Sequence, residues 1–131
     1  MIASYVANRK NPRLDDLGFA AQAELFDRLA QSAGGPPPVL DSTDLRADPP
    51  GRLAALCLAL GIAFTPRMQS WPAGPRPFDG VWAPHWYGAV HRSTGFDGPE
   101  GALPDLSPAQ ARLAEAALPH YEALARHRIR P

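Results

Sequence analysis

Apolar residues recur with the period of an α-helix in four stretches of this chain. The first is residues 1–10, where a helix is expected to end at the basic pair Arg9–Lys10, because cations stabilise a helix C-terminus. Its apolar positions are Met1, Ile2, Ala3, Tyr5 and Val6. The second stretch, about 15–30, follows an aspartate that can cap it, and "GGPPP" at 34–38 ends it. Its predicted buried positions are Leu17, Ala21, Leu25, Phe26 and Leu29.

One short segment predicts a strand instead. "PVLDS" at 38–42 is largely apolar, and turn-forming residues follow it. The third helix comes next, over about 49–60, with Asp48 as N-cap, proline in the first turn and Gly61 after its end. Its predicted buried stripe is Leu53, Leu56, Cys57 and Leu60. Cys57 is therefore expected to be a core thiol rather than a nucleophile.

Residues 62–106 show little periodicity but hold all three tryptophans of the chain. A loop of that length in a compact domain is usually functional, and a short helix is expected after Pro84. The fourth helix begins after Ser107, which forms a capping box with Gln110, and Pro119 predicts a kink or break in it. Its predicted inner face is Leu113, Ala117, Tyr121 and Leu124.

Charge and composition exclude several classes of function. Lys plus Arg number 13 and Asp plus Glu number 13, so the net charge of zero argues against a nucleic-acid or anionic-membrane binder. Lys10 is the one lysine, and the arginines are suited to phosphate or sulfate groups. No Cys/His set has zinc spacing, so no metal is expected. The single cysteine and the absence of secretory-signal features predict a cytoplasmic protein.

One strand cannot form a sheet, so two interpretations stay open: an all-α domain with a disordered aromatic middle, or a piece of an α/β protein. The second has a candidate. "MIASYVANRK" resembles the helix that follows the second phosphate-binding strand of sulfotransferases. "PVLDSTDLRADPPGRLAALCLALGI" resembles their later unit of strand, acidic-Leu turn and capped helix. "DGVWAPHWYGAVHRSTGF" and "PHYEALARHRI" resemble the C-terminal part of a bacterial sulfotransferase-like branch of P-loop-fold proteins.

The resemblance implies an α/β class: the C-terminal part of a three-layer P-loop fold, mostly helical as it stands. One or two short strands and a long aromatic-rich loop are expected. Residues 1–131 would form a single partial domain, divided into helices (1–33), a strand–turn–helix unit (38–61), the aromatic loop segment (62–106) and a C-terminal helix (107–128). A complete parent would transfer a sulfuryl group from 3′-phosphoadenosine 5′-phosphosulfate to a hydroxyl or amine of a small-molecule acceptor, without a metal.

The resemblance also suggests site residues. Ser4 matches a family serine that helps hold the 3′-phosphate of the co-substrate. Arg76 and Arg92 flank the aromatic block, where a late basic loop closes over the nucleotide in related enzymes. The acceptor pocket would be lined by His85, Trp86 and Tyr87. The phosphosulfate loop and the usual catalytic base belong upstream, so no catalytic residue is assigned within the chain.

Two expectations about state follow. The chain alone is expected to be inactive, and to associate with itself or with a missing N-terminal half.

Two other functions remain open on sequence alone. One is a non-enzymatic helical module that binds a protein through the Trp-rich loop. The other is a small hydrolase using His91 or His85, although a nucleophile motif such as G-x-S-x-G is absent.

Overall fold

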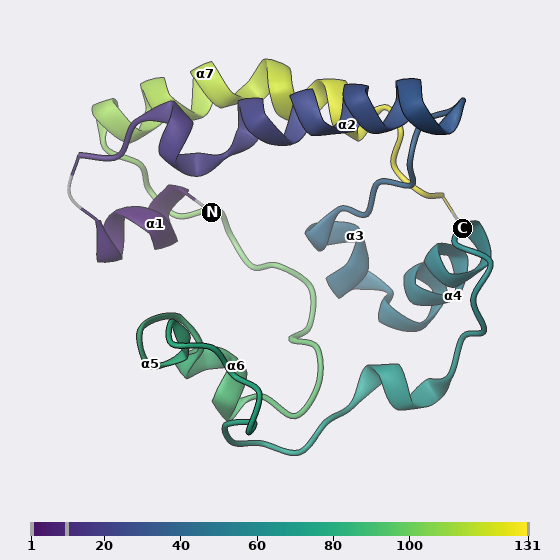
Figure 1. Ribbon diagram of the computed structural model, residues 1–131. Helices are drawn as coiled ribbons and strands as arrows, with labels where there is room; N and C mark the ends of the chain where they lie inside the picture. The colour runs from purple at the N-terminus through teal and green to yellow at the C-terminus, as the bar shows by residue number, and fades with distance from the viewer. Residues whose placement is uncertain (1, 10, 131) are drawn as a thin grey trace. The chain divides into compact units, whose positions relative to one another are not determined.

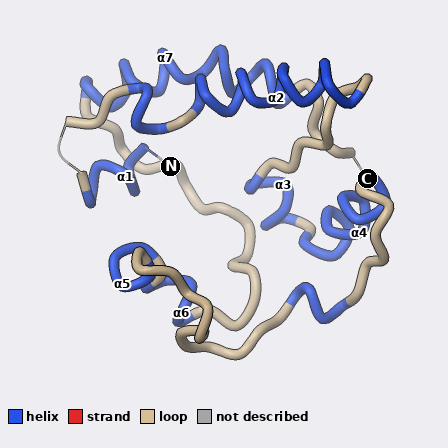
Figure 2. Tube along the Cα trace, in the orientation of Figure 1, coloured by secondary structure: helices blue, strands red, loops and turns tan. Residues whose placement is uncertain are grey.

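The computed structural model describes residues 2–9 and 11–130, and nearly all of its regular structure is helical (Figures 1 and 2). The expectation of a mostly helical chain is therefore confirmed. The residues divide into two compact units. One is Met1–Asp41 with Gly101–Ile129, and the other is Ser42–Glu100 with the last two residues.

The first unit contains α1 (Ile2–Asn8), the 3-10 helix η1 (Leu14–Leu17), α2 (Phe19–Ala33) and α7 (Pro108–Ala125). The two long helices α2 and α7 lie side by side, and α1 and η1 also contact α7 (Figure 1). Leu17 and Ala117 are the described side chains buried in this unit. The core is small because the helices meet largely through alanines.

The predicted buried face of α2 is wrong in part. Leu25 is 52% exposed, and Leu29 is exposed as well. Phe26 is half-buried, in keeping with its predicted place. The other half-buried positions of α2 are Phe19, Ala20, Ala23 and Ala30, which also follow a helical spacing. The Phe26 ring lies 4.8 Å from the His127 ring, measured between centroids. A face of alanines and two phenylalanines therefore packs inward, and Leu25 and Leu29 lie on the outside.

Helix α7 starts as predicted, with the Ser107–Gln110 capping box. The predicted break at Pro119 is wrong, because α7 is one helix from Pro108 to Ala125; the kink there stays a prediction. On the predicted inner face, Ala117 is buried, but the Tyr121 ring is partly exposed. The Tyr121 hydroxyl donates to an Asp41 carboxylate oxygen at 2.7 Å, which ties α7 to the segment after α2.

The strand predicted at 38–42 is not formed. Val39 makes an isolated parallel bridge with Arg128, in which the Ile129 N–H donates to the Val39 carbonyl at 2.9 Å. No strand is assigned anywhere in residues 2–9 and 11–130. The three prolines at 36–38 lack N–H donors, so the segment cannot extend the bridge into a ladder on that side.

The second unit contains α3 (Ser42–Ala47), α4 (Pro49–Ala59), η2 (Pro66–Gln69), α5 (Ala83–Trp86) and α6 (Gly88–Arg92). Helix α4 has the predicted cap, since an Asp48 oxygen accepts the Gly51 N–H at 3.1 Å. Gly61 closes the helix with a φ of 67°, a conformation that favours glycine. Helix α3 occupies the segment predicted as a turn.

Cys57 is buried, at 3% exposure, so its predicted place in the core is confirmed. Its sulfur lies 3.8 Å from the Met68 sulfur, which joins α4 to η2. Leu60 at the end of the predicted stripe is exposed; it is the C-cap residue, one position beyond the last residue of the helix, Ala59.

Residues 62–106 form three short helices rather than an uninterrupted loop, and α5 begins beside Pro84 as expected. In the described part of the chain, no helix combines the length and the hydropathy needed to cross a bilayer.

Candidate functional site

Two segments of the second unit lie side by side, although about twenty residues separate them in sequence. Ser70 and Gly95 form an antiparallel bridge. The Trp71 N–H donates to the Thr94 carbonyl at 3.0 Å, and the Gly74 N–H donates to the His91 carbonyl at 2.7 Å. A Cβ on residue 95 would lie 3.1 Å from the Gln69 carbonyl oxygen, so glycine allows this close approach.

The side chain of Trp71 is held in place by this pairing. Its indole N–H donates to the Ser93 hydroxyl oxygen at 3.0 Å, and the Ser93 hydroxyl donates in turn to the Val90 carbonyl at 2.7 Å. The Phe96 ring packs edge-on against Trp71, with centroids 5.4 Å apart. The buried polar end of the indole is therefore satisfied, and the ring has a fixed orientation.

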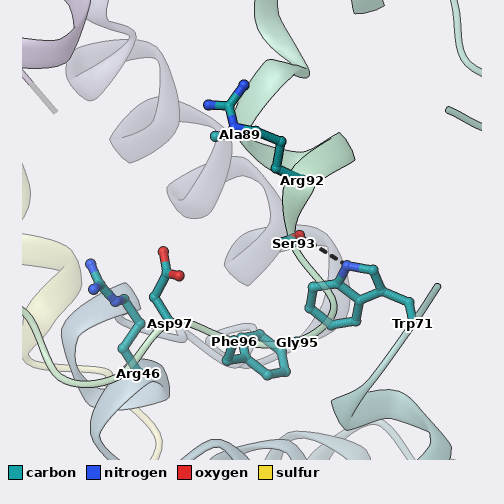
Figure 3. Close-up of a pocket in the computed structure, with 8 residues that line it drawn as sticks. All are labelled: Arg46, Trp71, Ala89, Arg92, Ser93, Gly95, Phe96 and Asp97. Atoms are coloured by element: carbon teal, nitrogen blue, oxygen red, sulfur yellow. Dashed lines mark hydrogen bonds between the residues drawn. The ribbon is translucent and has the colours of Figure 1, made fainter. Parts of the chain in front are cut away.

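An open pocket of about 450 Å³ lies beside Trp71 (Figure 3). This volume is within the range of small-molecule sites. All of its lining residues belong to the second unit. They are Arg46, Trp71, Ala89, Arg92, Ser93, Gly95, Phe96 and Asp97.

The pocket contains three charged side chains with different surroundings. Arg46 is engaged by its neighbours: its Nε donates to the Gly98 carbonyl at 2.9 Å, and its guanidinium lies 3.7 Å from a Glu100 carboxylate oxygen. Within residues 2–9 and 11–130, no hydrogen bond or ion pair is found for the side chains of Arg92 and Asp97. One cation and one carboxylate are therefore available to a ligand.

Asp79 and His91 form a second polar cluster. His91 Nε2 lies 2.8 Å from Asp79 Oδ2, and the same oxygen accepts the Arg76 N–H at 2.7 Å. The Arg76 N–H is the main cause that holds the pKa of Asp79 below its ordinary value, partial burial opposes it, and the bond to His91 adds to the lowering. Neither Asp79 nor His91 lines the pocket beside Trp71. This cluster therefore connects the turn at 76–79 to α6 by hydrogen bonds.

Of the residues predicted from sequence, Arg92 alone lines this pocket. Arg76 lies in the turn at 76–79, and its guanidinium donates to the Pro72 carbonyl. Ser4 lies on α1 in the other unit.

The predicted acceptor residues lie outside the pocket beside Trp71. His85 and Trp86 are on α5, and Tyr87 follows them. All three are exposed, and the Tyr87 ring packs against the His91 ring with centroids 5.9 Å apart.

Sequence reasoning missed Arg46, Trp71, Phe96 and Asp97 as pocket residues. Trp71 and Phe96 stood out as members of the aromatic block, but their pairing depends on a bridge between two irregular segments. No periodic pattern marks such a bridge. Arg46 comes from a helix that was predicted as a turn.

Cofactor sites can be tested against the same residues. Within the described ranges, no group of three or more His, Cys, Asp or Glu side chains could hold a metal ion. A phosphosulfate group needs a loop of backbone N–H groups at a helix N-terminus, together with a cation. The described long helices α4 and α7 begin instead at Asp48 and Ser107, whose side chains each accept one of the first N–H groups. Helix α2 begins at Gly18 without a side-chain cap, but Asp15 and Asp16 precede it and would repel an anion. The described residues therefore do not provide a cradle for phosphosulfate.

The chain matches a known protein family. The family model described as a sulfotransferase domain matches residues 1–128, almost the whole chain. The chain belongs to the sulfotransferase domain family.

Two curated relatives come from Arabidopsis thaliana. Branched-chain-amino-acid aminotransferase-like protein 1 is 40% identical over 116 residues, which cover 88% of this chain and 21% of the relative. Branched-chain-amino-acid aminotransferase-like protein 2 is 38% identical over 112 residues, which cover 86% of this chain and 20% of the relative. This sulfotransferase domain chain thus spans about a fifth of the length of each relative. No solved structure matches it.

Proposed function

We propose that this chain is the C-terminal part of a three-layer P-loop sulfotransferase-like domain. The complete parent would transfer a sulfuryl group from 3′-phosphoadenosine 5′-phosphosulfate to a hydroxyl or amine, and the chain would be inactive by itself. One observation carries the proposal. The family match extends over residues 1–128, yet the described residues offer no cradle for the phosphosulfate. The part that binds the reacting group would then come from elsewhere.

The exposed surface supports the need for a second part. The chain exposes 9645 Å². Two separate compact units of this combined mass would expose only about 8,000 Å², so the excess does not depend on how the two units are arranged. Large apolar side chains are exposed in both units, including Leu25, Leu29, Phe78, Val81 and Trp82. Uncovered apolar surface of this extent is typical of an interface that lacks its partner.

The residue roles suggested by the family are part of the same proposal. Ser4 would contact the 3′-phosphate, and Arg76 and Arg92 would supply positive charge to an anionic group. His85, Trp86 and Tyr87 would contribute to an acceptor surface. Within this proposal the chain is one partial domain, works without a metal, acts in the cytoplasm, and binds neither nucleic acid nor membrane.

A second candidate function is a non-enzymatic module that binds a protein partner. Phe78 and Val81 are each 84% exposed and Trp82 is 65% exposed, all within five residues. Aromatic side chains at a protein surface are frequent anchors of binding. In the first proposal a missing half of the domain would cover the same cluster. Only a functional experiment therefore distinguishes the sulfotransferase-like fragment from the interaction module.

The experiment supplies the missing part in trans. The N-terminal half of a family member that carries the phosphosulfate loop is mixed with this chain, and transfer of [³⁵S]sulfuryl groups to a panel of phenols and amines is measured. The proposal expects no transfer by either part and transfer by the mixture. Transfer by this chain alone contradicts its inactivity. A stable complex that neither binds the nucleotide nor transfers sulfuryl groups favours the interaction module.

A further inference from the structure

We propose that the pocket beside Trp71 binds a small zwitterion with an aromatic side chain, in which an ammonium group and an acidic group lie close together. Free aromatic amino acids have this chemistry. As a binding site the proposal stands on the pocket alone. The additional statement that such a molecule is the acceptor in the complete parent rests on the function proposed above.

The charges carry the first step. Arg92 and Asp97 both line the pocket, and neither side chain has a described partner. Arg46 contributes little net charge, since Glu100 lies against it. A simple anion would be attracted by Arg92 and repelled by Asp97, and a simple amine would meet the reverse. A zwitterion satisfies both groups at once.

Arg92 is also placed to reach a ligand. It ends α6 four residues after Gly88, and a Cβ on residue 88 would lie 3.5 Å from Arg92 Nη1. The guanidinium therefore folds back over the glycine, along the side of α6 that borders the pocket through Ala89 (Figure 3). A guanidinium in this position can bind a carboxylate through two parallel hydrogen bonds.

The aromatic rings carry the second step. Trp71 is fixed by the hydrogen bond from its indole to Ser93, and Phe96 lies at 84° to it. Two rings in a fixed edge-to-face pair form an apolar wall that needs little reordering on binding. A third ring can pack against this wall. The pocket therefore matches a ligand that is apolar at one end and zwitterionic at the other.

The test uses three probes that differ by one charged group each: L-phenylalanine, phenethylamine and 3-phenylpropionate. Each is titrated into the ¹⁵N-labelled full chain, and the indole N–H signal of Trp71, assigned from the Trp71→Phe spectrum, reports binding. We expect phenylalanine to bind at least fivefold more tightly than either probe with one charge. Equal binding of all three, or no shift of the Trp71 signal with phenylalanine, overturns the proposal.

Two substitutions assign the charges. Arg92→Gln should weaken binding of phenylalanine and phenylpropionate about five- to tenfold and should not weaken binding of phenethylamine, which Arg92 repels. Asp97→Asn should weaken binding of phenylalanine and phenethylamine and should not weaken binding of phenylpropionate, which Asp97 repels. Arg67→Gln and Asp105→Asn remove the same charges at exposed positions outside the pocket and should have no effect. A uniform loss of all three probes in both pocket variants, with unchanged backbone spectra elsewhere, contradicts the charge assignment.

A fourth titration separates this proposal from the sulfotransferase function. In the chain completed by a phosphosulfate-loop half, 3′-phosphoadenosine 5′-phosphate is titrated against wild type and Arg92→Gln. If Arg92 binds the amino acid in place of the nucleotide role that the family suggests for it, the nucleotide affinity is unchanged by the substitution. A tenfold loss of nucleotide affinity, with phenylalanine binding intact, assigns Arg92 to the nucleotide and overturns the zwitterion site.

Discussion

His91 Nε2 and Asp79 Oδ2 lie 2.8 Å apart, although twelve residues separate them along the chain. The sequence offered His91 only as one of two candidate histidines, and the structure pairs it with a carboxylate. The same Asp79 oxygen accepts the Arg76 N–H, so a single carboxylate joins the turn at 76–79 to α6. Through these contacts the pair holds the turn at 76–79 against α6.

The first prediction concerns the pH dependence of this contact. The folded-state pKa of Asp79 is lowered below its ordinary 3.8. Its stabilisation is therefore fully present above the unfolded-state pKa, and it is lost as the pH falls through the folded-state value. Asp79→Asn should reduce the free energy of unfolding at pH 5, and the gap from wild type should shrink steadily toward pH 2. Urea unfolding followed by circular dichroism measures both.

Asp105→Asn is the matched control. Asp105 is exposed, and no hydrogen bond or ion pair is described for it within residues 2–9 and 11–130. This variant should follow the wild-type curve throughout the pH range. A gap between wild type and Asp79→Asn that stays constant down to pH 2 would show that ionisation of Asp79 does not matter to the fold.

The capped helices were predictable because their signals are local. Asp48 with the prolines that follow it, and Ser107 with Gln110, fix the starts of α4 and α7 within a few residues of sequence. The strand at Val39 failed because a strand depends on a neighbour, and that neighbour, Arg128, lies at the other end of the chain. The inner face of α2 was predicted wrongly in part because leucine is more hydrophobic than alanine and is therefore assigned to the buried face first. In the structure the alanines of α2 face inward, and Leu25 and Leu29 do not.

The pocket was less predictable than the helices. Arg92 was recognised as a basic residue beside the aromatic block, and it does line the pocket. The bridge between Ser70 and Gly95 brings Trp71 and Asp97 to the same pocket. No periodic pattern in the sequence predicts this bridge. Pairing between irregular segments depends on individual hydrogen bonds, and these become visible only in three dimensions.

The second prediction concerns the cap of α4. A methyl group on Gly51 would collide with the Asp48 carboxylate that accepts the Gly51 N–H. Asp48→Ala should cost about 0.5–2 kcal/mol. Gly51→Ala should then stabilise the Asp48→Ala background by up to about 1 kcal/mol, because alanine favours the helix. In the wild-type background the displaced cap should cancel that gain.

A thermodynamic cycle of the two single variants and the double variant measures this coupling. The expected interaction term between the two substitutions is about 1 kcal/mol. Strict additivity would show that the Asp48 side chain does not cap the helix.

The third prediction compares neighbouring residues of α4. Cys57 is buried, and the adjacent Leu58 is 84% exposed. Cys57→Ser should cost about 1–3 kcal/mol, because it places a hydroxyl in an apolar site, and Leu58→Ala should change stability by less than about 0.5 kcal/mol. Equilibrium unfolding of both variants checks the pair. Equal losses of unfolding free energy at the two positions would contradict the assignment of Cys57 to the buried face of α4 and Leu58 to the exposed face.

The fourth prediction concerns self-association. The exposed apolar cluster at Phe78, Val81 and Trp82 should drive the isolated chain into dimers or larger species. Sedimentation velocity of the Phe78→Asp, Val81→Asp double variant should show a shift toward monomer. The control variant Asn11→Asp, Thr94→Asp adds the same charge at exposed positions outside the apolar clusters and should associate like wild type. A wild type that is monomeric at 100 µM contradicts the need for a covering partner.

The fifth and most direct measurement is a calorimetric titration of 3′-phosphoadenosine 5′-phosphate into this chain, alone and after addition of a half that carries the phosphosulfate loop. Since Asp48 and Ser107 cap the starts of α4 and α7, and Asp15 and Asp16 precede the uncapped start of α2, the chain alone should release no binding heat up to millimolar nucleotide. The completed complex should bind at micromolar concentration. Micromolar binding by the chain alone would contradict the account, because the nucleotide site would then lie within these residues.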